Sequence, residues 1–128
     1  SPVGRTLLTD SPLSYQFAQT LDFTKNNPRF MQPNYDVNIS ITDKFRNYAS
    51  DHGVAASTLA IAWILAKEEH IIPIPGTRSS VHLRELAAAM DFDMTPKILD
   101  DIETILPLGW AHGDRYSEAQ WIGPERYC

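Results

Sequence analysis

The chain of 128 residues contains a single cysteine, Cys128, at its last position, so no intrachain disulfide can form. Such sparing use of cysteine is typical of a cytosolic setting, and a cytoplasmic location is expected. Basic residues are also scarce: 11 stand against 16 acidic ones, the net charge is −5, and no basic run occurs. Proteins that bind nucleic acid present a basic run or face, so this class is excluded.

Long apolar runs and clusters of metal ligands are missing as well. No apolar run approaches the roughly 18 residues of a membrane span, and no signal-peptide pattern opens the chain, so no membrane contact is expected. No two of the four histidines stand about three to five residues apart, the spacing of paired metal ligands. No Ser/His/Asp or Cys/His arrangement can be argued either. The sequence therefore predicts no metal site and no catalytic residue.

The most informative segment, residues 70–86, predicts a short buried strand, a turn and a helix. Isoleucines dominate residues 71–74, and a β-branched run without charge is typical of a strand covered on both faces. Pro73 and Pro75 cannot donate hydrogen bonds to a neighbouring strand, so this strand must be short. Gly76 then allows a close backbone turn.

A helix is expected to follow, with Ser79 or Ser80 as its N-cap. Its apolar face would carry Leu83, Leu86, Ala87 and Met90. The first turn offers free backbone N–H groups and a partial positive charge, to which Thr77 and Arg78 add donors, and such a set suits a phosphate. A serine cap near an arginine is also common in α/β proteins that bind no phosphate, so the chemistry alone leaves both readings open.

Three further helices are expected, over residues 34–52, 56–67 and 96–106. The first carries an apolar stripe, which consists of Val37, Ile41, Phe45, Tyr48 and Ala49, and it ends at Gly53. The second is apolar nearly all round and should be buried on most sides, with Trp63 in the core. Its N-terminus lacks a capping side chain at Ala55. The third begins with Thr95 as its N-cap.

Several strings resemble, in order, the C-terminal part of the aldo-keto reductase family. Ile-Pro-Gly-Thr-Arg at 74–78 is similar to the family's last strand–loop–helix, and Ser-Pro-Val-Gly at 1–4 is similar to the segment after its seventh strand. Residues 22–30 and 114–120 resemble two segments of its longer-loop subgroup. The resemblance implies an α/β fold. Residues 1–128 would form the C-terminal part of one TIM (β/α)8 barrel: the last two strands, their helices, an extra helix and the tail.

The same resemblance implies an NADPH-dependent oxidoreductase that reduces small aldehydes or ketones. The family's catalytic Asp, Tyr, Lys and His lie in earlier strands and match no residue here, so this chain alone is predicted to be inactive. Because the chain starts at Ser1 without an initiator Met, we expect a longer protein whose N-terminal half completes the barrel. Two alternatives stay open: a cofactor-binding regulatory subunit, like the reductase-like β subunits of potassium channels, or another phosphate-binding barrel.

The matching positions imply a cofactor site, which consists of Ser1, Val3, Gly4, Ile74, Gly76, Thr77, Arg78, Ser79, His82 and Glu85. By the resemblance, the first three lie along the pyrophosphate and the next three beneath the adenosine ribose. Arg78 and Ser79 would hold the 2′-phosphate, and Glu85 would contact the adenosine. His82 stands where many members have Arg. Leu86 stands where the family usually has Asn, so one polar contact to the adenine amine is expected to be absent.

Two segments have uncertain roles by sequence. Residues 22–30 fit either an excursion over the cofactor or an ordinary surface connection. The tail, residues 109–128, is expected to dock against the body, with a direct substrate contact by Tyr116 or Trp121 as the alternative.

Overall fold

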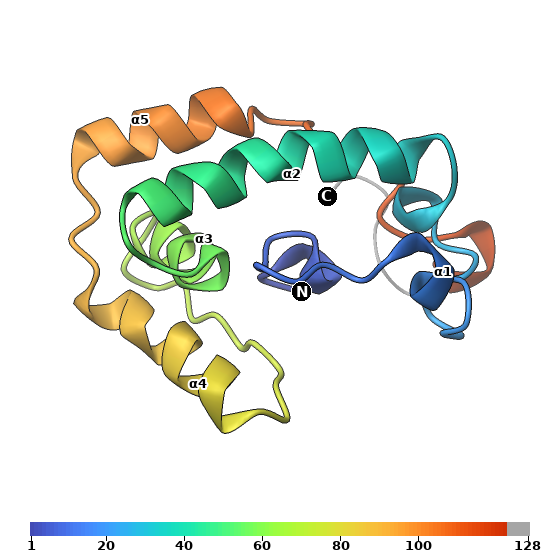
Figure 1. Ribbon diagram of the computed structural model, residues 1–128, viewed down its shortest axis with the longest axis horizontal. Helices are drawn as coiled ribbons and strands as arrows, with labels where there is room; N and C mark the ends of the chain where they lie inside the picture. Colours follow the sequence, from blue (N-terminus) through green and yellow to red (C-terminus); the bar gives the residue numbers. More distant parts are fainter. Residues whose placement is uncertain (123–128) are drawn as a thin grey trace.

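Helix α2, Asn34–Asp51, is the longest element of the computed structural model, which describes residues 1–122 (Figure 1). In chain order the 3-10 helices (η) and α-helices are η1 (Gly4–Thr6), α1 (Tyr15–Ala18), η2 (Pro28–Phe30), α2, α3 (Ala56–Leu65), α4 (Ser80–Ala87), η3 (Ala88–Asp91), α5 (Pro96–Ile105) and η4 (Glu118–Gln120). No helix within the described range is long and apolar enough to cross a bilayer.

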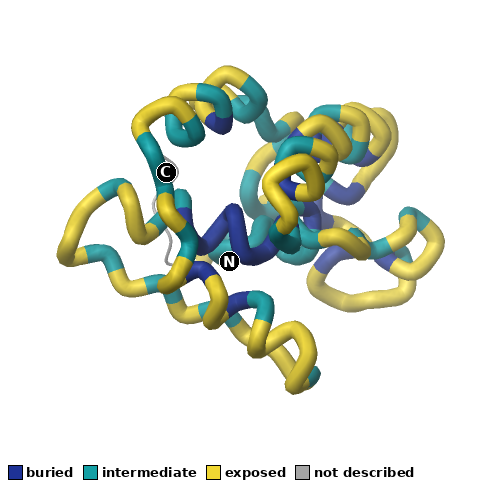
Figure 2. Tube along the Cα trace, turned by 60° about the vertical axis from the view of Figure 1, so that its left-hand side comes forward, coloured by how far each residue is buried: buried dark blue, intermediate teal, exposed yellow. Residues whose placement is uncertain are grey.

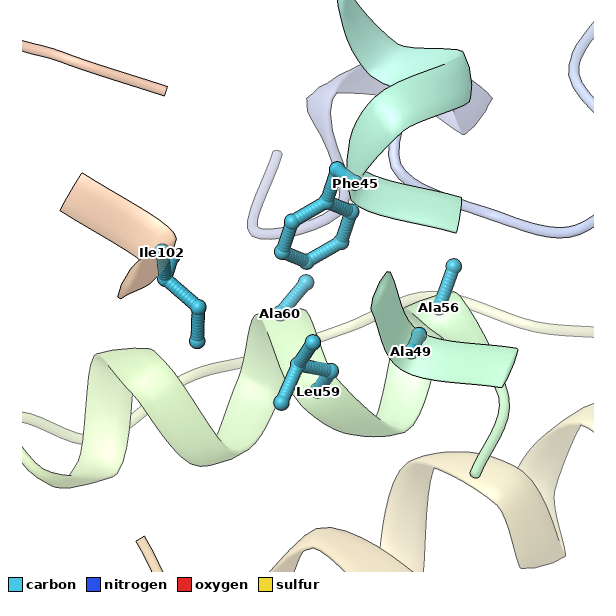
Figure 3. Close-up of a cluster of buried hydrophobic side chains, with 6 residues drawn as sticks. All are labelled: Phe45, Ala49, Ala56, Leu59, Ala60 and Ile102. Atoms are coloured by element: carbon cyan, nitrogen blue, oxygen red, sulfur yellow. The ribbon is translucent and has the colours of Figure 1, made fainter. Parts of the chain in front are cut away.

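The central core forms where α2, α3 and α5 meet. Figure 3 shows its buried members, which are Phe45, Ala49, Ala56, Leu59, Ala60 and Ile102. Alanines at the crossing let α2 and α3 approach closely, and Phe45 fills the space between α3 and Ile102. The predicted cap of the last helix is confirmed, because the Thr95 side chain accepts from Ile98 N, and Ile98, Ile102 and Ile105 of this helix face the core.

The buried face of α2 differs from the predicted stripe. It consists of Tyr35, Asn38, Thr42, Phe45 and Ala49. Phe45 and Ala49 belong to both sets, but Val37 is 36% exposed. Two polar residues, Asn38 and Thr42, are buried on this face because their side chains form hydrogen bonds. Thr42 Oγ1 donates to Asn38 O at 2.9 Å, and the Asn38 side-chain amide donates to His112 O in the tail.

Helix α3 is buried through its first two turns, as predicted (Figure 2). Its far side packs against α4 and η3 in a second cluster, which consists of Ile61, Ala62, Leu86 and Ala89. Of the apolar face expected on α4, Leu86 is buried, but Leu83 and Met90 are 58% and 76% exposed. The expected face is only partly covered because one side of α4 meets α3, and because the helix tightens into η3 after Ala87, which brings Ala89 inward.

The prediction of a buried strand at 71–74 is wrong for the described residues, among which no strand occurs. Ile72 and Ile74 are 82% and 86% exposed. A strand needs a neighbour to satisfy its N–H and C=O groups, and residues 1–4 are closed into a turn, with Gly4 N donating to Ser1 O at 3.0 Å. The described chain is therefore helical, where an α/β unit was expected.

Candidate functional site

A cavity of about 210 Å³ opens between the N-terminal loop and the turn that precedes α4. Its lining consists of Val3, Thr6, Thr9, Asp10, Ser11, Ser57, Gly76, Thr77, His82, Glu85 and Leu86. The cavity thus joins half of the positions predicted for the cofactor, although they come from two segments far apart in sequence. We call it the loop–α4 cavity.

The α4 side of the loop–α4 cavity is shaped by two hydroxyl groups. Ser79 caps α4, because its Oγ accepts from His82 N at 3.4 Å, as the sequence predicted. Thr77 Oγ1 accepts from Ser79 N at 3.1 Å and thereby fixes the turn before the helix. Thr77 Oγ1 also donates to Ser79 O at 3.4 Å, so both hydroxyl groups serve to shape the turn before α4.

The body of the protein anchors the opposite end of α4. Thr58 Oγ1, on α3, donates to the backbone carbonyl of Glu85 at 2.6 Å. Leu86 is buried against α3 and lines the cavity. Because its lining includes the carboxylates of Asp10 and Glu85 and no arginine or lysine, the cavity suits an uncharged, hydrogen-bonding ligand better than a phosphate.

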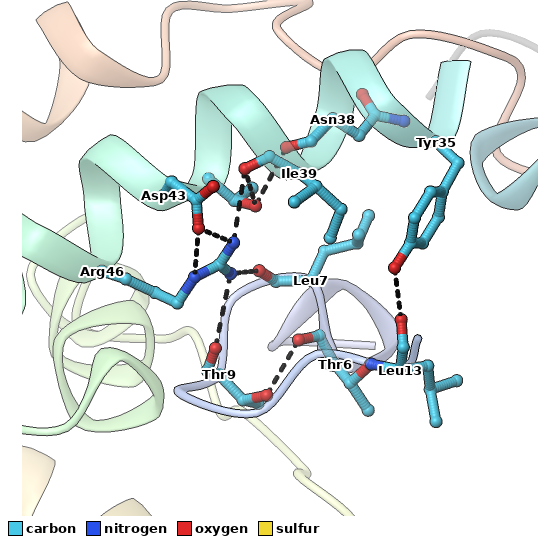
Figure 4. Close-up of polar contacts among 10 residues, drawn as sticks. Thr6, Leu7, Thr9, Leu13, Tyr35, Asn38, Ile39, Asp43 and Arg46 are labelled. Atoms are coloured by element: carbon cyan, nitrogen blue, oxygen red, sulfur yellow. Dashed lines mark hydrogen bonds and ion pairs between the residues drawn. The ribbon is translucent and has the colours of Figure 1, made fainter. Parts of the chain in front are cut away.

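Helix α2 holds the N-terminal wall of the loop–α4 cavity (Figure 4). Arg46 donates to Leu7 O at 2.8 Å and to Thr9 O at 3.4 Å, while Asp43 pairs with the same guanidinium at 2.8 Å. Tyr35 Oη donates to Leu13 O at 2.8 Å. These hydrogen bonds tie the loop of residues 7–13 to α2 near both of its ends. The N-terminal wall of the cavity is therefore held in place by α2.

A second cavity, of about 270 Å³, lies on the other side of the η1 turn. Its lining consists of Ser1, Gly4, Arg5, Arg29, Phe30 and Arg115. Two predicted cofactor positions, Ser1 and Gly4, therefore lie here and not in the loop–α4 cavity. We call this space the arginine cavity. The remaining predicted positions, Ile74, Arg78 and Ser79, line neither cavity.

The turn between the two cavities has a strained backbone. Gly4, Arg5 and Thr6 all have positive φ, of 57°, 54° and 79°. Two consecutive residues with a Cβ in this region are uncommon, and such strain persists only where surrounding contacts impose it. Leu13 N supplies one of these contacts, by donating to Thr6 Oγ1 at 3.0 Å.

The tail docks against the body through its backbone, as expected for its described part. Asn38, buried in α2, donates to His112 O at 2.9 Å and accepts from His112 N at 2.8 Å. Asn27 Nδ2 donates to Arg115 O at 2.9 Å, and Gln120 Nε2 donates to Phe23 O at 3.1 Å. Residues 22–30 and α2 thus together hold the described part of the tail. The end of the predicted tail, residues 123–128, lies outside the described residues.

The sequence did not single out Arg5, Arg29 or Arg115 as site residues. Arg29 and Arg115 do lie within Asn-Pro-Arg-Phe and Asp-Arg-Tyr, in the two segments that resemble the longer-loop subgroup, but that resemblance implies no role for them. Across residues 1–122, no group of three or more His, Cys, Asp or Glu side chains is placed to hold a metal ion.

Known proteins are similar to this chain in sequence. The family model "Aldo/keto reductase family" matches residues 1–107. "Probable aldo-keto reductase 1" of Glycine max is 31% identical over 91% of this chain and 33% of its own length. The aldo-keto reductase yakc of Schizosaccharomyces pombe, whose printed name adds NADP(+), is 28% identical over 91% of this chain and 34% of its own length.

The chain therefore spans about a third of the length of these curated relatives. No solved structure matches it. Because the family model covers most of the chain, including both segments that form the loop–α4 cavity, the chain belongs to the aldo/keto reductase family.

Proposed function

We propose that this chain is the cofactor-binding C-terminal part of an NADPH-dependent oxidoreductase that reduces aldehydes or ketones. The observation that carries the proposal is the loop–α4 cavity, in which Val3 meets Gly76, Thr77, His82 and Glu85. Family membership supports the reductase class, and the NADP(+) in one relative's name supports the cofactor.

The residues fit an adenosine with a phosphate at its edge. The loop–α4 cavity offers hydroxyl groups and uncharged walls to the nucleoside. Arg78 directly follows the cavity residue Thr77, is exposed, and forms none of the hydrogen bonds or ion pairs recorded between described residues. An exposed arginine beside a capped helix N-terminus is suited to the 2′-phosphate of NADPH. When bound, NADPH would supply the hydride for reduction of the carbonyl group.

The exposed apolar residues support the incomplete barrel. Ile72 and Ile74 precede the loop–α4 cavity with more than four fifths of their surface exposed, which is unusual for residues of this type. In the proposed whole protein, an N-terminal half would cover this segment and pair with it as a strand. That half would also carry the catalytic residues, so the 128-residue chain alone should show no reductase activity. A cytoplasmic location stays a prediction.

The test compares NADPH with NADH, which lacks the 2′-phosphate. Hydrogen bonds to charged groups contribute roughly 1.5–3 kcal/mol, and 1.4 kcal/mol is about tenfold in affinity. Arg78→Ala in the full-length protein should therefore raise the dissociation constant for NADPH about ten- to a hundredfold and leave that for NADH nearly unchanged. Fluorescence titration at one fixed salt concentration measures both constants.

The control is Arg84→Ala, which removes an exposed arginine of α4 that lines neither cavity. Equal losses for the two cofactors in Arg78→Ala would mean that Arg78 holds the loop and does not read the phosphate. No loss for either cofactor would remove the site assignment. Both relatives carry reductase names, which favours an enzyme over the regulatory subunit.

A further inference from the structure

Three arginines from distant segments meet in the arginine cavity. Arg5 comes from the η1 turn, Arg29 from η2 and Arg115 from the tail. The lining of the loop–α4 cavity, by contrast, contains no arginine. This convergence is unexpected in a chain whose net charge is −5.

Two of the guanidinium groups are held in place by protein acceptors. Arg5 Nη1 donates to Arg115 O at 2.7 Å, and its guanidinium carbon lies 4.5 Å from the ring centre of Phe23 and 4.9 Å from that of Tyr116. Arg29 Nε donates to Gly113 O at 3.2 Å. Both bonds use one N–H of a group that has five, so most donors of Arg5 and Arg29 stay available.

The side chain of Arg115 makes fewer hydrogen bonds with described residues than those of Arg5 and Arg29. Its guanidinium lies 5.6 Å from the Tyr116 ring centre. Within residues 1–122, its side chain donates no hydrogen bond. Its backbone carbonyl, by contrast, accepts from both Arg5 and Asn27. The backbone of Arg115 thus helps to dock the tail, whereas its guanidinium contacts the Tyr116 ring and enters no hydrogen bond with a described residue.

The positive charges are close together and poorly balanced. None of the ion pairs recorded between described residues includes Arg5, Arg29 or Arg115. Burial lowers the pKa of Arg5, and the charges of Arg115 and Arg29 lower it further, while Tyr116 acts in the opposite direction. Burial and then Arg115 lower the pKa of Arg29, whereas Asp114 raises it. The cluster would be stabilised by an anion.

We propose that the arginine cavity is an oxyanion site, which binds a carboxylate or phosphate group through Arg5, Arg29 and Arg115. Guanidinium groups suit such ligands because their planar N–H pairs match two oxygens at once. Within the proposed function, on which this step rests, the oxyanion belongs either to an acidic carbonyl substrate or to the diphosphate of the cofactor. The site itself requires only the three arginines.

The first experiment tests the site without any catalysis. Inorganic phosphate is titrated into the full-length protein by calorimetry, with Arg115→Gln, Arg78→Gln and the control Lys44→Gln in parallel. Lys44 is exposed on α2 outside both cavities, so its variant loses the same charge elsewhere. We expect one phosphate-binding event that survives Arg78→Gln and Lys44→Gln and is weakened at least about tenfold in Arg115→Gln.

No phosphate binding, or binding that Arg115→Gln leaves unchanged, would overturn the oxyanion site. Circular dichroism shows whether each variant is folded. If Arg115→Gln does not fold, Arg115→Lys replaces it, because it keeps the charge and loses the planar fork. An affinity that Arg115→Lys weakens supports the site, and an unchanged affinity contradicts it.

The second experiment separates the two sources of the oxyanion. It compares kcat/KM for 4-carboxybenzaldehyde and for its uncharged methyl ester, together with the dissociation constant of NADPH. If the substrate supplies the oxyanion, Arg115→Gln lowers kcat/KM at least about tenfold for the acid alone. If the cofactor supplies the oxyanion, Arg115→Gln weakens NADPH binding and lowers kcat/KM equally for both aldehydes. A protein that reduces neither aldehyde and binds no NADPH would contradict the proposed function, while the phosphate titration would still decide the oxyanion site.

Discussion

The carboxylate of Asp10 accepts a hydrogen bond from the backbone N–H of Ala56 at 3.0 Å. Ala56 is the first residue of α3, and the residue before it, Ala55, has no side chain that can cap the helix. A loop 46 positions earlier in the chain thus supplies the missing cap. The same bond ties the N-terminal wall of the loop–α4 cavity to the helix that supports α4.

Asp10→Ala should destabilise the protein. Loss of a helix-capping acceptor costs about 0.5–2 kcal/mol of stability, and the N–H of Ala56 would lose its partner. Asp10→Asn keeps an oxygen acceptor, so its loss of stability should be smaller. Urea unfolding followed by circular dichroism gives the free energy of unfolding for each variant. Equal stability of the wild type and Asp10→Ala would show that solvent satisfies this helix end.

Asn38→Ala should detach the tail. Its buried amide bonds both the N–H and the carbonyl of His112, and it also donates to Arg29 O at 3.1 Å. A buried polar group left unsatisfied costs about 1–3 kcal/mol. Amide hydrogen exchange at His112 should accelerate together with this loss of stability. Asn47→Ala, an exposed change of the same kind on α2, should leave both unaltered; parallel behaviour of the two variants would contradict the role of Asn38.

Gly113→Ala should cost more than Gly109→Ala, although both glycines lie in the tail with positive φ, of 87° and 79°. Left-handed backbone costs a residue with a Cβ about 1–2 kcal/mol in either position. At Gly113 the added Cβ would also lie 2.7 Å from Pro28 O, whereas nothing lies within 4 Å at Gly109. Overpacking adds about 1–3 kcal/mol. Thermal unfolding of the two variants tests the difference. Equal losses of stability would mean that the tail moves away from Pro28 without cost.

Tyr48 should ionise at unusually high pH. Burial and the hydrogen bond from its hydroxyl group to Asp101 Oδ2, at 2.9 Å, raise the pKa of Tyr48 to about 12. Because an unfolded tyrosine ionises near pH 10, the folded state binds the proton more tightly. Its contribution to stability is complete below about pH 10 and is lost as the pH rises to about 12.

Ultraviolet titration of phenolate absorbance should show this late tyrosine. The late step should disappear in Tyr48→Phe, and Asp101→Asn should shift it to lower pH because the acceptor loses its charge. A titration curve that Tyr48→Phe leaves unchanged would contradict the assignment.

Local sequence determined much of the helical structure. Helices α2, α3 and α5 begin and end close to their predicted bounds, because apolar spacing, the Thr95 cap and the glycine at position 53 act within one or two turns. Ser79 likewise caps α4 where its short-range pattern predicts. The family resemblance was also readable from local strings, and the family model confirms it.

Tertiary structure decided which residues are buried and which side chains meet. The sequence predicts an Ile-rich strand at 71–74, but a strand requires a partner, and within residues 1–122 none is supplied. The polar interior of α2 and the capping of α3 by Asp10 depend on groups far away in the chain. The arginine cavity arises in the same way: charge repulsion among three arginines is overcome by backbone acceptors and aromatic rings that only the folded chain brings together.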